Sequence, residues 1–493
     1  MKRRWSTLFY IVIVAGLGFA IYCIAKKGSA LQSPALTAQQ IQNENTSTGT
    51  SSFQVFTDSL KHGLTDPLAV LLLQIIVIIA CARFFGYLFK KINQPAVIGE
   101  IVAGIILGPS ILGLFFPPIN HFLFPAASLG TLHFLSHIGL ILFMFIIGME
   151  LDLKMITKQA YGAVIMSHAG IIIPFTLGMG IAYFIYAEFA PAGISFLSFG
   201  LFMGITMSIT AFPVLARILK ERGLIRTNLG ITALTCAAAD DLTAWCVLAA
   251  VIALVKSGSS VSAFYTIALA ATYLAIMFTI IRPALKRLED LYNNREKKRA
   301  AIIALLFLLL IVSSYITSVI GINALFGAFI AGVIMPPSFS FRKIVVDKIE
   351  DVSLILLLPL FFVVTGLKTQ IGLLNQPHLW ITFGWLLLVA VGGKFGGITI
   401  AAKVIGQSWK DSLSIGVLMN TRGLMQLIVL NIGYDLGILT PEIFAMMVLM
   451  ALVTTFMTGP AMDLINWLMP EKAEDTNELK GNITEFTGEQ TVP

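Results

Sequence analysis

Charged residues are scarce in this chain: Asp, Glu, Lys and Arg make up only 12% of its 493 residues. An ordinary soluble domain carries roughly twice that share. Apolar residues, at 57%, dominate instead. This balance excludes a soluble globular protein and indicates one whose solvent is the lipid bilayer. The net charge of +7 does not indicate nucleic-acid binding, because the basic residues lie in short loops between apolar segments.

Cysteine and histidine are also few, with four and six residues. The cysteines lie in apolar stretches without C-x-x-C spacing, so they predict neither a zinc site nor a disulfide framework. His133 and His137 are four residues apart on one helix face, but the sequence supplies no further ligand beside them. We therefore predict no metal site, no cofactor and no enzyme activity, and interpret the two histidines as interfacial.

Long apolar runs fill the rest of the chain. A bilayer requires about 20 apolar residues per helix. The predicted spans are 6–25, 67–89, 95–113, 133–151, 161–187, 196–217, 228–255, 262–282, 301–320, 323–336, 352–367, 379–403, 411–433 and 441–467. These make an all-α membrane protein with about thirteen core helices and one additional N-terminal span.

The basic residues predict the orientation, since cytoplasmic loops are rich in Lys and Arg. If Lys90 and Lys91 are cytoplasmic, alternation places on the same side Lys154, Lys158, Arg217, Lys220, Arg222, Arg226, the run 282–299, Arg342, Lys343, Lys348, Lys403 and Lys410. The other side receives only Lys26, Lys27, Lys61, Lys256 and Lys368. A bacterial inner membrane with a cytoplasmic C-terminus fits this pattern.

Three regions follow from these patterns. Residues 1–64 combine an anchor or cleavable signal with a polar extracytoplasmic linker that is rich in Gln, Asn, Ser and Thr. Residues 65–469 form the transmembrane domain. Residues 470–493 form a short acidic tail, predicted to be disordered and cytoplasmic.

The transmembrane domain contains an internal repeat, about 67–255 and 301–467. "PAVIGEIVAGIILGPS" from Pro95 aligns without gaps with "NALFGAFIAGVIMPPS" from Asn323, and the segments that begin at Leu142 and Leu197 have parallels at Leu360 and Leu413. Shared membrane composition explains a single weak match. Three matches in the same order favour a duplication instead. The predicted orientations of the two copies are opposite. Inverted repeats are typical of secondary transporters that bind their substrate near the bilayer midplane.

Two matching segments of the repeats predict interrupted helices. In "MGITMSITAFPVLARIL", Pro213 breaks the helix while Ser208 and Thr210 can satisfy freed backbone groups. In "VLMNTRGLMQLIV", the helix is weakened by Asn420, Thr421, Arg422 and Gly423. We expect two discontinuous helices that cross, with carbonyls free to bind a cation. Two merely kinked helices are the alternative.

Two adjacent acids, Asp240 and Asp241, lie in the middle of an apolar span. An ionised aspartate costs about 2.5–3.5 kcal/mol there, so such groups indicate function. Neighbouring helical residues differ by about 100° in direction. We therefore expect Asp240 to pair with Lys394, which lies among four glycines, and Asp241 to face an aqueous cavity. A purely structural ion pair would leave the second acid unexplained.

Two acids and one lysine can exchange protons near neutral pH, and hard oxygen ligands suit a hard cation. Competition of Na⁺ or K⁺ with H⁺ at one site predicts antiport. Arg422 is expected to neutralise either a half-helix C-terminus or a nearby acid. The alternatives are a cation channel and a sodium-coupled solute symporter. An intramembrane aspartyl protease is excluded because its acids must converge from different helices.

Several motifs together resemble the monovalent cation:proton antiporter-2 family, closest to the plant cation/proton exchanger branch and its bacterial relatives. They lie between Asp66 and Trp467 and are "QPAVIGEIVAGIILGPSILG", "SITAFPVLARIL", "AAADDLTAW", "LPLFFVVTGL", "LMNTRGLMQLIVLNIG" and "FAMMVLMALVTTFMTGP".

The resemblance implies a sodium/proton antiporter-like fold in a homodimer, with a dimerisation scaffold and a mobile core that works as an elevator. It further implies that Asp241 is the main ion carrier, that Asp240 exchanges partnership with Lys394, and that Thr210 and its neighbours line the site. One departure is Gln426, where many relatives carry a glutamate. It puts an ion pair with Arg422 in doubt.

Overall fold

The computed structural model describes residues 52–150, 160–225, 227–257, 260–294, 299–336 and 352–470, with a few isolated residues between 16 and 27. Every regular element in these ranges is a helix. The predicted anchor is almost wholly outside them, as are the linker up to residue 51 and the tail after Pro470. Of the residues used above for orientation and for the repeat, the undescribed ones are Lys154, Lys158, Arg226, 295–298, Pro337, Ser338, Arg342, Lys343 and Lys348.

The chain divides into two compact units, Met1–Val70 and Leu71–Pro493. In the first unit, helix α3 (Ser52–Leu64) occupies the end of the predicted linker. Helix α4 (Pro67–Lys91) begins there and continues into the second unit. Its start is capped by Asp66, whose carboxylate accepts hydrogen bonds from the backbone amides of Leu68 and Ala69 at 3.1 and 3.3 Å.

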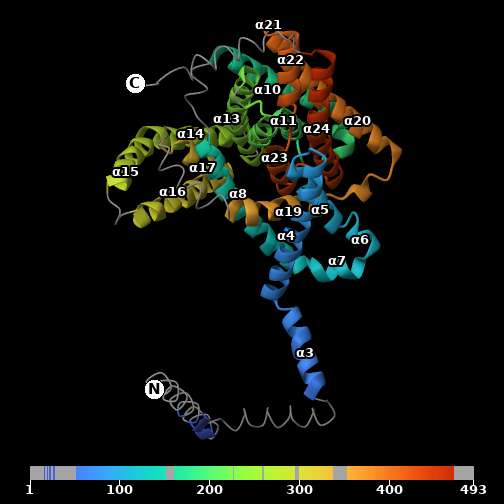
Figure 1. Cartoon of the computed structure of the whole chain (residues 1–493), viewed down its shortest axis with the longest axis vertical. Coiled ribbons are helices and arrows are strands. Elements are labelled where there is room, and N and C mark those ends of the chain that lie inside the picture. Colours follow the sequence, from blue (N-terminus) through green and yellow to red (C-terminus); the bar gives the residue numbers. More distant parts are fainter. Residues whose placement is uncertain are drawn as a thin grey trace, which may run out of the picture. The chain divides into compact units, whose positions relative to one another are not determined.

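The second unit contains the remaining helices (Figure 1). Those of the first half are α5 (Ala96–Leu107), α6 (Leu112–Phe115), α7 (Pro117–Leu123), α8 (Ala126–Glu150), α10 (Ala160–Phe189), α11 (Phe196–Ser208), α12 (Phe212–Glu221), α13 (Asn228–Ser257), α14 (Ser260–Ile276) and α15 (Arg282–Asn294). Those of the second half are α16 (Arg299–Ile320), α17 (Ala324–Val333), α19 (Leu358–Lys368), α20 (Pro377–Val391), α21 (Gly397–Val404), α22 (Trp409–Met419), α23 (Leu424–Asp435) and α24 (Pro441–Leu468).

Eleven helices in the described residues are long and apolar enough to cross a membrane. A bent pair, α22 and α23, and the short apolar helix α17 add to them. Each predicted range from 67–89 onward falls on one of these elements. The chain is therefore an all-α, multi-pass integral membrane protein. Some of its helices begin at a capping residue, as at Ser195, Ser408 and Thr440, whose hydroxyls accept hydrogen bonds from backbone amides of the first turn.

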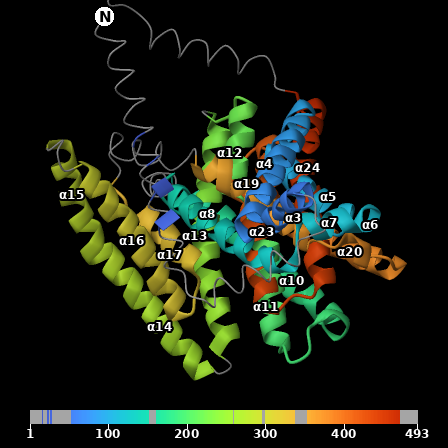
Figure 2. The ribbon, with the colours of Figure 1, turned by 90° about the horizontal axis from the view of Figure 1, so that it is seen from below.

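The helices of the second unit pack into two groups. The charged bundle consists of α10–α13 from the first repeat and α20–α24 from the second. The glycine bundle consists of α5, α8, α16, α17 and α19, with α15 packed along α16. Helix α14 contacts both α16 and α13 of the charged bundle. In both views of the ribbon, α14, α15 and α16 form one edge of this unit (Figures 1 and 2). Each group thus contains helices from both halves of the chain.

Glycines that the repeat alignment matches form equivalent close crossings in the glycine bundle. A Cβ atom on Gly104 of α5 would lie 2.6 Å from the Val363 carbonyl oxygen and 2.9 Å from Cα of Gly366. A Cβ atom on Gly332 of α17 would lie 2.2 Å from the Phe145 oxygen and 2.9 Å from Cα of Gly148. The sequence alignment pairs Gly104 with Gly332 and Gly148 with Gly366. The crossings α5–α19 and α17–α8 are therefore equivalent, as an inverted repeat requires.

Candidate functional site

Asp240 and Asp241 lie in the middle of α13, and both side chains are fully buried. Consecutive helical residues point in different directions, so the two carboxylates meet different surroundings. Asp240 faces Lys394, whose Nζ lies 2.8 Å from its Oδ2. The predicted pairing of Asp240 with Lys394 is thus present in the geometry.

Lys394 lies in a π-helical turn, Gly392–Gly396, between α20 and α21. Such bulges widen a helix locally and occur often at functional sites. The glycines leave room: a Cβ on Gly393 would come within 3.1 Å of α10 at Pro174. Besides Asp240, the Lys394 ammonium donates to the carbonyl oxygen of Gly170 at 2.9 Å and to that of Ser208. All three protons of this fully buried cation therefore have acceptors.

The first predicted interruption is present between α11 and α12. Helix α11 ends at Ser208, and Ile209 and Ala211 have extended or irregular backbone angles. Pro213 lies in the first turn of α12, where a helix does not use the missing N–H. The expectation that Pro213 breaks the preceding turn is refined accordingly: the proline starts the second half-helix.

Thr210 and Ser208 play different parts in this interruption. The Thr210 backbone amide donates to Asp240 Oδ2 at 3.1 Å, and its hydroxyl donates to the Met419 carbonyl at 3.1 Å. The Ser208 hydroxyl is directed at backbone carbonyls, those of Gly204 at 2.7 Å and Ile171 at 3.1 Å. Ser208 therefore reaches the charged group through its carbonyl, which accepts from Lys394, and not through its hydroxyl.

The second interruption lies between α22 and α23, which are bent by 40°. Its residues are Asn420, Thr421, Arg422 and Gly423. The two interruptions touch, because the Ala211 amide donates to the Thr421 carbonyl at 3.2 Å. The half-helix ends of both repeats therefore meet beside α13, at the level of the two acids.

Arg422 is fully buried and caps the C-terminus of the opposite half-helix. Its guanidinium donates to the carbonyls of Thr206 at 3.2 Å and Met207 at 2.7 Å in α11, and to that of Ala390 at 3.3 Å. Gln426 Oε1 lies 3.5 Å away, a long contact. Of the two roles expected for Arg422, the geometry matches neutralisation of a half-helix C-terminus.

Asp241 is different from its neighbour. Among the described residues, no atom donates a hydrogen bond to either of its carboxylate oxygens, and Oδ1 of Asp240 is also without a donor. The backbone N–H of Phe212, at the start of α12, interacts electrostatically with Asp241 but does not meet hydrogen-bond geometry. A buried carboxylate without a donor must be compensated by a proton or a cation.

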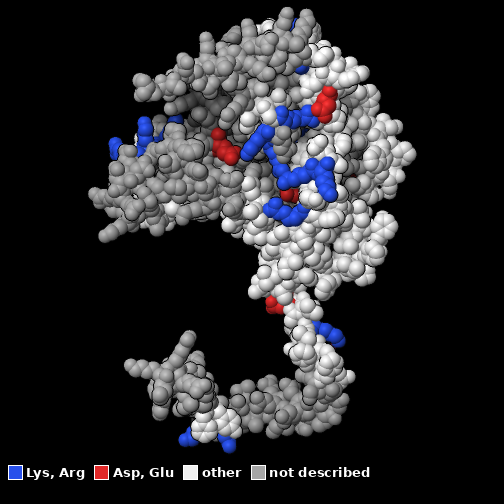
Figure 3. All heavy atoms as spheres, viewed as in Figure 1, with Lys and Arg blue, Asp and Glu red and all other residues white. Residues whose placement is uncertain are grey.

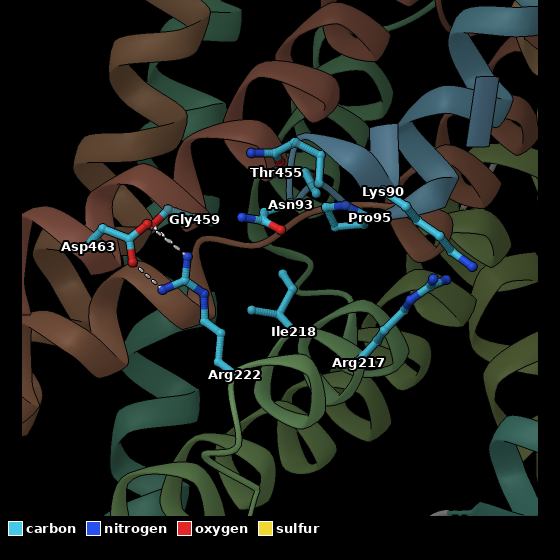
Figure 4. Close-up of a pocket in the computed structure, with 10 residues that line it drawn as sticks. Lys90, Asn93, Pro95, Arg217, Ile218, Arg222, Thr455, Gly459 and Asp463 are labelled. Carbon is cyan, nitrogen blue, oxygen red and sulfur yellow. Dashed lines mark hydrogen bonds and ion pairs between the residues drawn. The ribbon is translucent and has the colours of Figure 1, made fainter. Parts of the chain in front are cut away.

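A cavity of about 560 Å³ opens beside the second interruption. Figure 4 shows its walls: the α4–α5 connection with Asn93 and Pro95, helix α12 with Arg217, and α24 with Asp463. Arg222 reaches across to Asp463 at 2.5 Å, and Lys90 and Arg217 extend toward each other. Thr455 lines the cavity and donates to the Arg422 carbonyl, so the cavity wall adjoins the interruption. Basic side chains also gather on the face seen in Figure 3.

A helical membrane protein with an inverted repeat, two facing helix interruptions and a buried acid–lysine group is a secondary ion transporter. The chain belongs to the sodium/hydrogen exchanger family, whose transmembrane sequence profile matches residues 75–465. It is a transporter that exchanges cations for protons, not an enzyme, and the channel and symporter alternatives are excluded. The predicted family and the predicted all-α, sodium/proton antiporter-like fold are confirmed. The number of helices and the crossing of the two interrupted helices stay predictions.

Individual relatives agree with this assignment. The Na(+)/H(+) antiporter NhaS4 of Synechocystis is 42% identical over 80% of this chain and 97% of its own length. Cation/H(+) antiporter 17 of Arabidopsis thaliana is 38% identical over 88% of this chain and 52% of its own. The K(+)/H(+) antiporter 1 of Saccharomyces cerevisiae is 33% identical over 82% of this chain and 47% of its own. The chain thus spans about half the length of the plant and yeast relatives.

A solved structure shares the fold. The sodium proton antiporter MjNhaP1 from Methanocaldococcus jannaschii, solved at pH 8, superposes with a TM-score of 0.60 over 80% of this chain and 98% of its own. Its sequence identity is 17%, so the likeness concerns the fold alone.

The sequence predicted free carbonyls at the two interruptions, but not that Lys394 and Arg422 donate to them, nor that the Gly170 carbonyl takes part. The carbonyls of Gly170, Thr206 and Met207 accept from Lys394 and Arg422, and Thr455 supports the Arg422 backbone. Of these residues, only Gly170 is recognisable in the sequence, since a glycine within a long apolar helix permits close approach of another chain segment. A Cβ on Gly170 would lie 2.7 Å from the Ile398 side chain.

Proposed function

We propose that Asp241 is the group at which a proton and a monovalent cation, Na⁺ or K⁺, compete. The observation that carries this proposal is the unsatisfied carboxylate of Asp241 beside an Asp240 that is already paired. An acid inside the membrane that lacks a hydrogen-bond donor is stable only when neutralised. A proton neutralises it by covalent attachment and an alkali cation by coordination, and the two cannot share the same oxygen lone pair.

The surroundings of Asp241 are fixed by three residues, Asp240, Lys394 and Thr210. The Asp240–Lys394 pair fixes one carboxylate, and the Thr210 amide and hydroxyl tie that carboxylate to the Met419 carbonyl at the end of α22. When Asp241 takes up a cation, its neighbour's negative charge strengthens the attraction. We expect that in this state the Asp240–Lys394 ion pair weakens and a carboxylate oxygen of Asp240 also coordinates the cation. The coupling between cation and proton movement would then depend on Lys394.

The two bundles support a mechanism of alternating access. The site lies wholly in the charged bundle, whereas the glycine bundle is held by backbone-to-backbone crossings that tolerate little movement. We propose that the charged bundle carries Asp241 from one face to the other as an elevator against the glycine bundle. Binding of either ion neutralises the site and lowers the cost of this passage.

We further propose a homodimer in a bacterial inner membrane, with residues 65–469 as the transporting domain and the C-terminal tail in the cytoplasm. The distribution of Lys and Arg over alternate loops supports the orientation. The names of the relatives cover both Na⁺/H⁺ and K⁺/H⁺ exchange, which supports an alkali-cation site without deciding between the two ions.

Reconstitution of the full chain in proteoliposomes with an enclosed pH dye tests the function. Addition of Na⁺, K⁺ or Li⁺ in turn should drive proton movement for at least one of the ions. Proton movement that follows an imposed membrane potential without any dependence on cations would contradict exchange. Asp241→Asn, which cannot exchange a proton, should abolish the response.

A further inference from the structure

A second group of ionisable side chains lies away from Asp241, where α8, α19 and α23 meet. His133 and His137 lie in the first half of α8, and Asp435 is the last residue of α23. One ligand atom from each lies within 4.8 Å of the others. The fold thus supplies the third ligand that the sequence alone did not show for this histidine pair.

Two of the three distances between these atoms match those of a tetrahedral metal site, and the third is within 4.8 Å. The two histidine Nε2 atoms are 3.1 Å apart, and His133 Nε2 is 3.3 Å from Asp435 Oδ2. Zinc–ligand bonds of about 2.0–2.1 Å at tetrahedral angles place two ligand atoms about 3.3 Å apart. Two histidines four residues apart on one helix face, completed by a carboxylate from another element, is a common zinc ligand set.

A cation already lies at this position. Lys368, the last residue of α19, places its Nζ 2.7 Å from Asp435 Oδ1 and 3.2 Å from His133 Nε2. The ammonium group therefore neutralises the carboxylate and uses a histidine lone pair. A metal ion would replace one cation by another. His133, Lys368 and Asp435 are each partly exposed, so an ion can reach them from water.

We propose that His133, His137 and Asp435 bind a divalent transition-metal cation of the Zn²⁺ type, which displaces Lys368 and inhibits exchange by clamping α23 to α8. Helix α8 belongs to the glycine bundle, and α23 is the second half of the interrupted helix beside Asp241. A metal bridge between them would resist movement of the charged bundle. The inhibition rests on the proposed elevator mechanism, but the binding site does not.

Binding is tested first, without transport. The full chain in detergent should unfold at a higher temperature when ZnCl₂ is added, because a ligand that binds the folded state stabilises it. The Asp241→Asn variant should show the same shift, whether or not the proposed function holds. His133→Ala and His137→Ala should each weaken the apparent zinc affinity at least tenfold. His121→Ala, a matched histidine on α7 outside the group, should respond as the unchanged chain does.

Lys368→Met provides the opposite outcome, since removal of the competing ammonium should tighten zinc binding. Mg²⁺ should not produce the shift, because imidazole ligands do not suit hard cations.

The site is refuted if millimolar Zn²⁺ causes no shift in the unchanged chain, or if the double variant His133→Ala/His137→Ala keeps the same shift. In proteoliposomes, zinc on the side of these residues should inhibit exchange by the unchanged chain. Exchange that stays at full rate with zinc bound would refute the clamp while leaving the binding site.

Discussion

Arg422 donates a hydrogen bond of 2.7 Å to the carbonyl of Met207, which lies 215 residues earlier in the chain. Through this contact a cation in the second interruption closes the C-terminal end of the first half-helix. Lys394 does the same at Ser208. The two basic residues therefore stabilise the open carbonyls of α11, and only Lys394 has a carboxylate within ion-pair distance among the described residues.

Lys394→Ala tests the acid–lysine pair. Removal of one partner of a buried ion pair costs about 3–5 kcal/mol, because the remaining charge has no counterpart. We expect lower thermal stability and exchange with a different charge per cycle, measured as transport current against voltage. The double variant Asp240→Asn/Lys394→Met removes both charges and should regain part of the stability. Wild-type voltage dependence in Lys394→Ala would count against a role of the lysine in coupling.

Gln426→Glu should stabilise the protein. The Gln426 Nε2 group is buried without an acceptor in the described part of the chain, and Oε1 is 3.5 Å from the Arg422 guanidinium. A carboxylate removes the idle donor and strengthens the contact with the cation, by about 1 kcal/mol. Thermal unfolding in detergent measures the change.

The same substitution at Gln74 serves as its control. There the amide nitrogen donates to the Leu123 carbonyl at 2.8 Å and to Ser128 Oγ at 2.7 Å. Gln74→Glu removes both hydrogen bonds and should lower the unfolding temperature. Equal effects of the two substitutions would show that the Arg422 environment is not the cause.

Gly332→Ala tests the crossings between the repeats. Its Cβ would lie 2.2 Å from the Phe145 oxygen, so α17 and α8 must separate, which we expect to cost about 1–3 kcal/mol. Gly130→Ala on α8 is the matched control, because nothing lies within 4 Å of its Cβ. It should leave thermal stability unchanged or slightly raised. Unchanged thermal stability of Gly332→Ala would mean that the close crossing does not hold the glycine bundle together.

The competition of ions at one acid predicts how exchange depends on pH. As the proton concentration rises, a larger fraction of Asp241 is protonated, so more cation is needed to occupy the site. The apparent KM for the cation should therefore increase toward acid pH while the maximal rate at saturating cation changes little. Initial rates over a series of cation concentrations at several pH values measure this. A pH effect on the maximal rate alone would favour separate sites.

Much of this architecture was predictable from the sequence because the lipid imposes strict rules. Apolar runs predict the helices, and two acids in such a run require a basic partner, for which Lys394 among its glycines is a candidate. The glycines of the repeat are also informative, since a glycine in an apolar helix indicates a close backbone crossing that leaves no room for a side chain.

The rest depends on contacts between distant segments. The sequence left two roles open for Arg422, and the choice between them is set by backbone carbonyls, which every residue possesses and no pattern distinguishes. The direction of the Ser208 hydroxyl depends on how α11 ends, and the meeting of Asp435 with His133 depends on the packing of α23 against the glycine bundle. Each of these needs three-dimensional proximity that spacing along the chain does not encode.

Proton release on cation binding tests the central claim most directly. The purified chain, in weakly buffered detergent solution with a pH dye, is titrated with Na⁺ and with K⁺ starting from a pH at which exchange occurs. We predict that binding of the transported cation acidifies the solution and that Asp241→Asn releases no protons. Equal proton release by Asp241→Asn, or cation binding to the unchanged chain without any proton release across the active pH range, would contradict the account.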